Sequence, residues 1–394
     1  MRATSGDLGL SAPGLEQARA YVEGCVERGE IAGAVTVVTR HDQVVQLACI
    51  GMRDIEAGLP MEPDTIFRIA SMTKPISSVA ALTLVEAGRL RLDDPVSRYV
   101  PEFADLEVFD RIEDGRVVLA PLSRPISIHD LFTHMSGIDS DAPDPVLEAE
   151  FDNLGDARFG SAELMRRLAA HPLAHQPGEG WRYGWSLAVL GRVTEVVTGR
   201  PLGEHLESAV FAPLGMVDTG YRVPPEKAGR LAAVHSSEAG ALLRVDDEDT
   251  RAATEGFPLM TGSGGLNSTA LDYLRFTRML LGRGELDGVR LLKPESVDLM
   301  THNHLPPPLC PIAVWGHALE GEGYGLGVGV SIEPPAPGMP GPAGTYGWAG
   351  SWSTRFWIDP AHDLAGIFMV QSQPFAFVGP AEEFWTLVCE AVTA

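Results

Sequence analysis

The sequence lacks two features that would place the protein in a membrane or on a nucleic acid. No stretch approaches the ~18 consecutive apolar residues that a helix needs to cross a bilayer, so we expect no membrane partner. Positive charge is also scarce, since 30 Lys and Arg residues face 53 Asp and Glu residues, giving a net charge of −23. Such an acidic surface repels phosphate backbones, so we expect no nucleic-acid partner either.

Cysteine is rare, and its spacing forms no recognisable pattern. The chain contains four cysteines without a CxxC pair, namely Cys25, Cys49, Cys310 and Cys389. They indicate neither a disulfide framework nor a zinc site, and they suit a reducing compartment. The first residues lack a basic start followed by an apolar core, so we expect no secretory signal and a cytoplasmic location.

Three common catalytic or binding patterns are missing or incomplete. No GxSxG sequence occurs, so an α/β-hydrolase would lack its nucleophile turn. Gly325, Gly327 and Gly329 alternate without a following helix, which predicts close backbone packing rather than a nucleotide site. His302 and His304 stand in a polar loop without a nearby acidic cluster, which indicates surface residues rather than a metal site.

Segments rich in β-forming residues gather at the two ends of the 394-residue chain. Residues 33–40 and 44–51 predict an antiparallel hairpin. Strong strand patterns return only near the C-terminus, at 324–332, 353–359 and 364–372. Strands at both ends with helices between them predict an α+β fold, in which the two terminal segments build one antiparallel sheet.

Helical patterns fill the middle of the chain and also flank the predicted sheet. The predicted helices are 13–29, 71–88, 161–170, 185–199, 202–210, 269–282, 294–301 and 380–394. Thr269 and Asp272 have the spacing of a capping box at the start of one of them. We expect a sheet domain from residues 1–88 plus 312–394, a mainly helical domain from 89–311, and an active site between the two.

A serine and a lysine three residues apart give the sharpest chemical signal. Ser71 and Lys74 share one face if a helix starts here, and apolar residues follow directly. Ser71 would then lie in the first turn, where free backbone N–H groups and the helix dipole favour an alkoxide and a developing oxyanion. Lys74 could remove the serine proton if burial or a neighbouring charge keeps its amine neutral. By itself, this spacing is weak evidence, and it is more often a capping serine beside a surface lysine.

Four ordered segments carry a more specific signal. They are TIFRIASMTK (65–74), IHDLFTHMSG (128–137), PGEGWRY (177–183) and GSGGLNST (262–269). In this order they resemble the entry to the nucleophile helix, the "LLTHTSG" turn, the "PG…YS" segment and the "GGGLxST" turn of the penicillin-recognising serine hydrolases. That superfamily includes class C β-lactamases, DD-peptidases and family VIII carboxylesterases. The resemblance extends over nearly the whole chain and implies a β-lactamase/transpeptidase-like fold.

The resemblance gives Tyr183 a catalytic role beside Ser71 and Lys74. A phenol can act as base and acid when a cation is close, and Lys74 would be that cation. Two assignments stay open. Either Tyr183 takes the Ser71 proton while Lys74 tunes it, or Lys74 takes the proton and Tyr183 returns one to the leaving group. For His134, which lies in the family-like turn, we expect a structural hydrogen-bonding role rather than catalysis.

Two tryptophans depart from the pattern of the β-lactamases. The third element of the superfamily normally reads Lys-Thr-Gly or His-x-Gly, but here Trp348, Ala349 and Gly350 stand at that place. An indole thus replaces the cation that would bind a substrate carboxylate, which resembles the family VIII esterase variant. Ala349 and Gly350 keep the strand open to a substrate. Trp185 replaces the Asn of Tyr-x-Asn, which again favours a simple acyl substrate.

We therefore expect a serine hydrolase that cleaves carboxylic esters of short to medium acyl chain through an acyl-enzyme on Ser71. The backbone N–H groups of Ser71 and Ser351 would hold the oxyanion. Trp348, Trp185 and Trp352 would line an apolar pocket for the ester. The expected partner is a small-molecule ester, and the chemistry requires no metal or organic cofactor.

Other functions of the same fold stay open. A β-lactamase, a D-aminopeptidase and an acyltransferase would each use the same nucleophile. A non-catalytic binding protein is a different class, and the joint presence of Ser71, Lys74 and Tyr183 argues against it.

Overall fold

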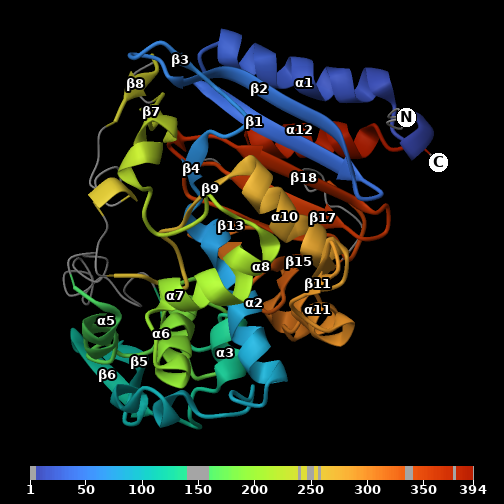
Figure 1. Ribbon diagram of the computed structural model, residues 1–394. Coiled ribbons are helices and arrows are strands. Elements are labelled where there is room, and N and C mark those ends of the chain that lie inside the picture. The colour runs from blue at the N-terminus through green and yellow to red at the C-terminus, as the bar shows by residue number, and fades with distance from the viewer. Residues whose placement is uncertain are drawn as a thin grey trace.

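An eight-stranded sheet forms the centre of the computed structural model, which describes residues 6–139, 159–237, 241–245, 253–255, 259–332, 340–375 and 379–393 (Figure 1). In sheet order the strands are β14 (Glu322–Tyr324), β15 (Gly329–Ser331), β16 (Tyr346–Ala349), β17 (Arg355–Asp359), β18 (Leu364–Met369), β1 (Gly33–Arg40), β2 (Gln43–Asp54) and β3 (Leu59–Pro60). All neighbouring pairs in this sheet are antiparallel. β1 pairs with β18 from Val35↔Met369 to Arg40↔Leu364, which confirms the predicted α+β sheet built from both ends of the chain.

Two helices from opposite ends of the chain cover one face of the sheet (Figure 1). They are α1 (Ala12–Glu27) and α12 (Pro380–Glu390). β1 is buried along its whole length because its two faces meet different apolar clusters. Val38 packs with residues of α1 and α12, whereas Val37 belongs to the cluster on the other face. The alternation of side chains along a strand thus places apolar residues in both cores.

The other face packs against α10 (Ala270–Leu281). Its apolar cluster includes α2 (Thr73–Glu86) and continues into α3 (Ile128–Phe132), α6 (Ser186–Thr198) and α7 (Leu202–Leu206). Figure 1 shows these last three helices gathered at the end of the molecule away from α1. Most of α2 is buried, as expected for a helix that is apolar on nearly all sides, and close packing on several faces fixes its position.

Shorter elements complete the fold. They are β4 (Ile66–Arg68), β5 (Glu107–Glu113), β6 (Arg116–Pro121), α5 (Ser161–Leu168), α8 (Ala212–Leu214), β7 (His235–Ser236), β8 (Leu243–Arg244), β9 (Asn267–Thr269), β10 (Glu285–Leu286), β11 (Val289–Arg290), α11 (Pro294–Met300), β12 (Ala313–Val314), β13 (His317–Ala318) and β19 (Ser372–Gln373). The predicted helices are present with ends shifted by a few residues. Within the described ranges, none of the helices has the length and apolar character needed to cross a membrane.

The single strand predicted over 324–332 is wrong, because the chain reverses there and forms the hairpin of β14 and β15. The turn is built on glycines that meet neighbouring elements at close range. A Cβ on Gly325 would lie 2.2 Å from a backbone oxygen of α11, and one on Gly327 would lie 2.0 Å from the Ser78 hydroxyl of α2. The predicted close packing of these glycines is therefore confirmed, and it presses the turn against the helix that follows Ser71.

Candidate active site

Ser71 stands between a short two-stranded sheet and a buried helix. β4 pairs with β9 in antiparallel fashion and leads into Ala70–Met72, a single 3₁₀ turn. The φ of Ala70 is 44°, in the left-handed region, so the backbone makes a tight turn before a regular helix can form. The predicted helix start at Ser71 is therefore wrong, because α2 begins only at Thr73. The serine is held at the mouth of α2 rather than within it.

Lys74 is the buried partner of Ser71. Its side chain is only 3% exposed, and its Nζ donates to Ser71 Oγ at 3.0 Å and to the Ser263 carbonyl oxygen at 2.9 Å. The same Nζ lies 4.5 Å from the centre of the Tyr183 ring. The amine is thus held in one place by the serine, a loop carbonyl and an aromatic face.

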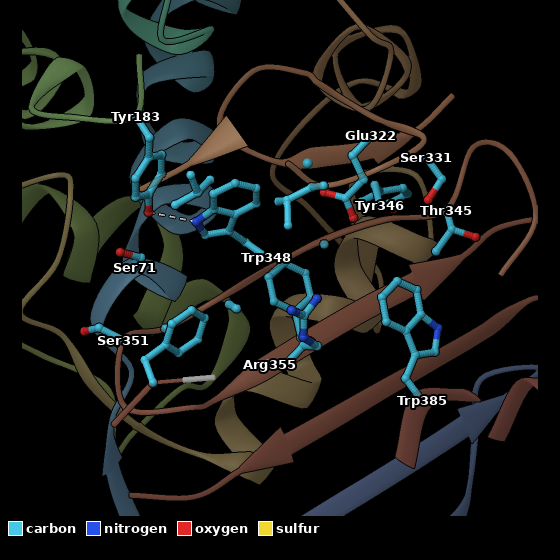
Figure 2. A pocket seen from close by; sticks show the side chains of 18 of the residues that line it. Ser71, Tyr183, Glu322, Ser331, Thr345, Tyr346, Trp348, Ser351, Arg355 and Trp385 are labelled. Carbon is cyan, nitrogen blue, oxygen red and sulfur yellow. Dashed lines mark hydrogen bonds between the residues drawn. The ribbon is translucent and has the colours of Figure 1, made fainter. Parts of the chain in front are cut away.

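Tyr183 approaches this pair from the loop that precedes α6. The Trp348 indole on β16 donates its Nε1–H to the Tyr183 hydroxyl oxygen at 2.9 Å (Figure 2). The two rings are 5.3 Å apart. A donor aimed at the phenol oxygen stabilises negative charge there, which is what a phenol that accepts a proton needs.

His134 supports the site from behind Tyr183. Its ring is fully buried, and its centre lies 5.0 Å from that of Tyr183. The His134 carbonyl accepts from the Arg182 N–H at 3.1 Å, and Nδ1 accepts from the Gly184 N–H at 3.4 Å. Burial, together with the charge of Lys74, holds the pKa of His134 well below its usual value. The imidazole is therefore neutral and accepts one long hydrogen bond through Nδ1, while Nε2 is buried without a hydrogen-bond partner among the described residues.

A pocket of about 600 Å³, counting the space open to solvent, lies in front of the serine. It brings together six of the residues predicted from the sequence, namely Ser71, Tyr183, Trp348, Ala349, Gly350 and Ser351. Trp185 and Trp352 are not among its lining residues in the described part of the chain, so the pocket proposed below does not include them. Strand β16 and the residues after it thus form one wall of the site.

The sequence did not point to several further lining residues. Trp315, at the tip of the hairpin β12–β13, meets the Tyr183 ring edge-on at 6.0 Å and the Phe375 ring at 6.0 Å. It is 49% exposed, a property of the folded chain that no motif in the sequence marks. Glu322 and Arg355 also line the pocket, and no motif marks either of them.

The loop that contains His302 and His304 was predicted to lie at the surface, but His304 contacts other residues. His304 Nδ1 lies 3.0 Å from His129 Nε2, and its Nε2 lies 2.8 Å from the Leu299 carbonyl oxygen. His304 is therefore half-buried rather than a surface residue. Among the described residues, no group of three or more His, Cys, Asp or Glu side chains has an arrangement that could hold a metal ion.

A family model described as Beta-lactamase matches residues 18–387. The chain belongs to this family. The β-lactamase-family chain is 37% identical to Protein Rv1367c of Mycobacterium tuberculosis over 374 residues, covering 91% of this chain and 90% of Rv1367c. It is 32% identical to Esterase EstB of Burkholderia gladioli over 381 residues, covering 89% of this chain and 88% of EstB.

A solved structure of similar shape is EstCE1, described as a hydrolase with promiscuous acyltransferase activity. The TM-score is 0.81 at 26% identity, and the match covers 97% of the β-lactamase-family chain and 99% of EstCE1. The protein is thus a serine hydrolase of the β-lactamase-like superfamily that also contains esterases, as the motifs implied.

Proposed function

We propose that the protein hydrolyses carboxylic esters of short to medium acyl chain through an acyl-enzyme on Ser71. The observation that carries the proposal is the 3.0 Å contact between Lys74 Nζ and Ser71 Oγ, in a pocket that Trp348 and Tyr183 also line. A serine hydroxyl becomes a useful nucleophile only when a base lies within hydrogen-bond reach. Lys74 meets this condition in the structure as it stands.

In the first half of the reaction, Ser71 Oγ attacks the ester carbonyl and its proton passes to Lys74 or Tyr183. Lys74 as base would keep its donated hydrogen bond to the Ser263 carbonyl and turn its lone pair to Ser71. Tyr183 as base would hold its negative charge against the Trp348 N–H. The leaving alcohol then takes the proton, and the acyl group stays on Ser71. In the second half, water attacks the acyl carbonyl and gives a proton to the same base, the bond between the acyl group and Ser71 Oγ breaks, and the proton returns to Ser71 as the acid leaves.

The oxyanion of each tetrahedral intermediate would be held by the backbone N–H groups of Ser71 and Ser351. Both residues line the same pocket, and neither N–H donates to another described backbone group outside regular elements. Fixed donors of this kind favour the charge that develops in the transition state because they need no reorganisation.

Trp348 favours an ester over a β-lactam. A β-lactam or peptide substrate carries a carboxylate that a Lys or His at this position would bind, whereas an indole offers an apolar wall and a single N–H. That N–H is already directed to Tyr183. The 32% identity to Esterase EstB supports the same choice.

Acyl transfer is the second candidate. It is favoured by the likeness to EstCE1, a hydrolase with promiscuous acyltransferase activity. In this reaction an alcohol or amine replaces water as the acceptor of the acyl group. Adding an alcohol to the assay separates the two activities, because a transferase forms the new ester in preference to the free acid.

Replacing Ser71 by alanine tests the proposal directly. Ser71→Ala should abolish turnover of a short-chain p-nitrophenyl ester, and a fluorophosphonate probe should label wild type on the Ser71 peptide only. Ser77→Ala is the matched control, because Ser77 lies on the same buried helix and its hydroxyl has no hydrogen-bond partner among the described residues. Undiminished turnover by Ser71→Ala would end the assignment, and nitrocefin turnover equal to ester turnover would favour a β-lactamase.

A further inference from the structure

The inner end of the active-site pocket contains a buried carboxyl group that the proposed reaction does not use. Glu322 lies on β14, opposite Ser331 of β15, and is only 8% exposed. It lines the same pocket as Ser71 (Figure 2). A Cβ built on Gly329 would lie 3.2 Å from Glu322 Oε2 and 2.9 Å from the nearest atom of the Trp348 ring. The carboxyl of Glu322 and the indole of Trp348 therefore lie close together beside Gly329, whose missing side chain leaves space for both.

This carboxyl has no hydrogen-bond donor and no ion-pair partner within 4.0 Å among the described residues. The nearby cation is already engaged, because Arg355 Nη2 forms an ion pair with the carboxylate of Glu382. Glu382 is itself 5% exposed and accepts from the Gly379 N–H at 3.0 Å. The charges of Arg355 and Glu382 thus neutralise each other, and a negative charge on Glu322 has no counter-ion within 4.0 Å among the described residues.

A buried carboxyl without a partner is costly, so its presence in a substrate pocket points to a group that arrives with the substrate. The walls nearest to it are aromatic, since Trp348 and Tyr346 line the pocket on either side of Glu322, and Trp385 lines the same pocket farther away (Figure 2). Aromatic faces together with one unbalanced carboxylate are the surroundings that bind an ammonium group. A second carboxylate in the ligand would instead meet Glu322 with repulsion.

We propose that the pocket beyond Trp348 binds a protonated amine carried by the ester substrate, with the Glu322 carboxylate as its partner. This rests on the proposed ester hydrolysis and narrows the substrate class to amino-substituted esters. The ammonium would donate a hydrogen bond to Glu322, while the apolar part of the substrate crosses the Trp348 ring toward Ser71.

The test uses pairs of esters that differ only in charge. One member ends in a dimethylammonium group and the other in an isopropyl group of the same shape, with spacers of increasing length on the acyl side and, in a second series, on the alcohol side. Wild type should favour the dimethylammonium ester in kcat/KM for at least one spacer. Glu322→Gln should reduce that preference, taken as the ratio of the two kcat/KM values, about tenfold or more.

Glu320→Gln is the matched control, because Glu320 is exposed, lies two positions along the chain, and changes the net charge equally outside this pocket. It should keep the preference of wild type. If Glu320→Gln loses the preference equally, the effect is long-range attraction and the site is ruled out. A wild type that favours the isopropyl ester, or a terminal hydroxyl over the ammonium, also overturns the proposal.

A pH series on wild type gives a second test that needs no variant. Burial raises the pKa of Glu322 to about 7, against the opposing charge of Arg355 and with a further rise from Glu382. Tyr324 and Tyr346 are the other titratable groups close by, and burial raises the pKa of both phenols, so they stay neutral. The preference for the ammonium ester should therefore grow between about pH 6 and pH 8. A preference independent of pH would contradict the proposal.

The two proposals fail in different ways. If wild type hydrolyses no ester, or if the Ser71→Ala variant still hydrolyses esters, the proposed hydrolysis is wrong. Turnover of isopropyl esters that depends on Ser71, without any preference for their ammonium counterparts, defeats only the amine site.

Discussion

Trp348 contributes to the site in two ways, through the N–H of its indole and through the face of its ring. The indole N–H donates to the Tyr183 hydroxyl, and the ring forms a wall of the pocket. A lysine in its place would bring charge to the same spot, whereas the indole brings one directed donor and apolar surface. In the proposed reaction this residue would disfavour anionic substrates, and it donates a hydrogen bond to Tyr183.

Trp348→Phe separates these two contributions, because phenylalanine keeps an aromatic wall and removes the donor. We expect kcat for a neutral ester to fall about tenfold to a hundredfold, since a hydrogen bond to a charged group is worth ~1.5–3 kcal/mol, and KM to change little. Steady-state kinetics check this. In a Tyr183→Phe background the same substitution should have almost no further effect, and full additivity of the two losses would show that the contact has no role.

At the residue scale, the sequence was informative where a motif exists and silent elsewhere. Ser71, Lys74 and Tyr183 stand in ordered segments that resemble a known superfamily. Glu322 and Arg355 do not, because their roles depend on neighbours that the fold supplies from distant parts of the chain. Burial of a charged side chain depends on the packing of the whole molecule, so no local sequence pattern predicts it.

The hairpin of β14 and β15 packs against α2, the helix that follows Ser71. Gly327 has a φ of 87°, its N–H donates to the Phe132 carbonyl at 3.1 Å, and a Cβ there would lie 2.0 Å from Ser78 Oγ. The turn therefore touches α3 and α2 together. Any side chain at this position must push α2, and with it Ser71.

Gly327→Ala should lower the free energy of unfolding by at least about 2 kcal/mol, because the new methyl group overpacks α2 in addition to the strained backbone. It should also reduce kcat, since Ser71 is displaced. Urea unfolding and ester kinetics measure the two effects. Gly288→Ala is the control, because Gly288 has a φ of 81° but nothing within 4 Å of its Cβ position. An equal loss in both variants would leave only backbone strain as the cause.

At the element scale, long periodic segments were predicted well and short irregular ones were not. Only one of the two hydrogen bonds of the predicted capping box at α10 forms, namely that from the Asp272 N–H to Thr269 Oγ1 at 3.0 Å. The Asp272 carboxylate accepts from the Asp218 N–H at 2.7 Å instead of from the Thr269 N–H. The hairpin of β5 and β6 was not predicted, because its charged and mostly exposed residues show no clear alternation. Tertiary contacts decide such segments.

Across the whole molecule, buried histidines link stability to pH. Burial is the largest cause that lowers the pKa of six of them, namely His129, His134, His175, His205, His235 and His304. Because the folded protein resists protonation at these sites, the unfolded chain binds more protons once the pH falls below about 6.5. Their contribution to stability is complete above that pH and decreases below it.

Three buried carboxyls act in the opposite direction, since burial raises the pKa values of Glu322, Asp272 and Glu382. The folded state binds protons more readily at these sites, so they favour folding at lower pH. The ordinary pKa of histidine lies inside the range from about pH 7.5 to about pH 5.5, whereas those of Asp and Glu lie below it, so we expect the histidines to dominate and the melting temperature to fall across this range. Thermal denaturation across this range measures the change.

His205→Leu should flatten that pH dependence, because it removes a buried imidazole of α7 whose only side-chain hydrogen bond among the described residues is a long one, from Nε2 to the Ala80 carbonyl oxygen of α2 at 3.4 Å. Melting curves of wild type and variant at both ends of the range give the comparison. Identical slopes would mean that His205 takes no part in the acid response.

The pairing of β1 with β18 has a consequence for protein synthesis. β1 leaves the ribosome long before residues 364–369 are made, because most of the described chain lies between the two strands. Until then one edge of β1 has no strand beside it, and the indole that faces Tyr183 has not been made or has only just emerged. A nascent polypeptide therefore carries Ser71 for a long part of its synthesis before the pocket wall formed by β16 exists.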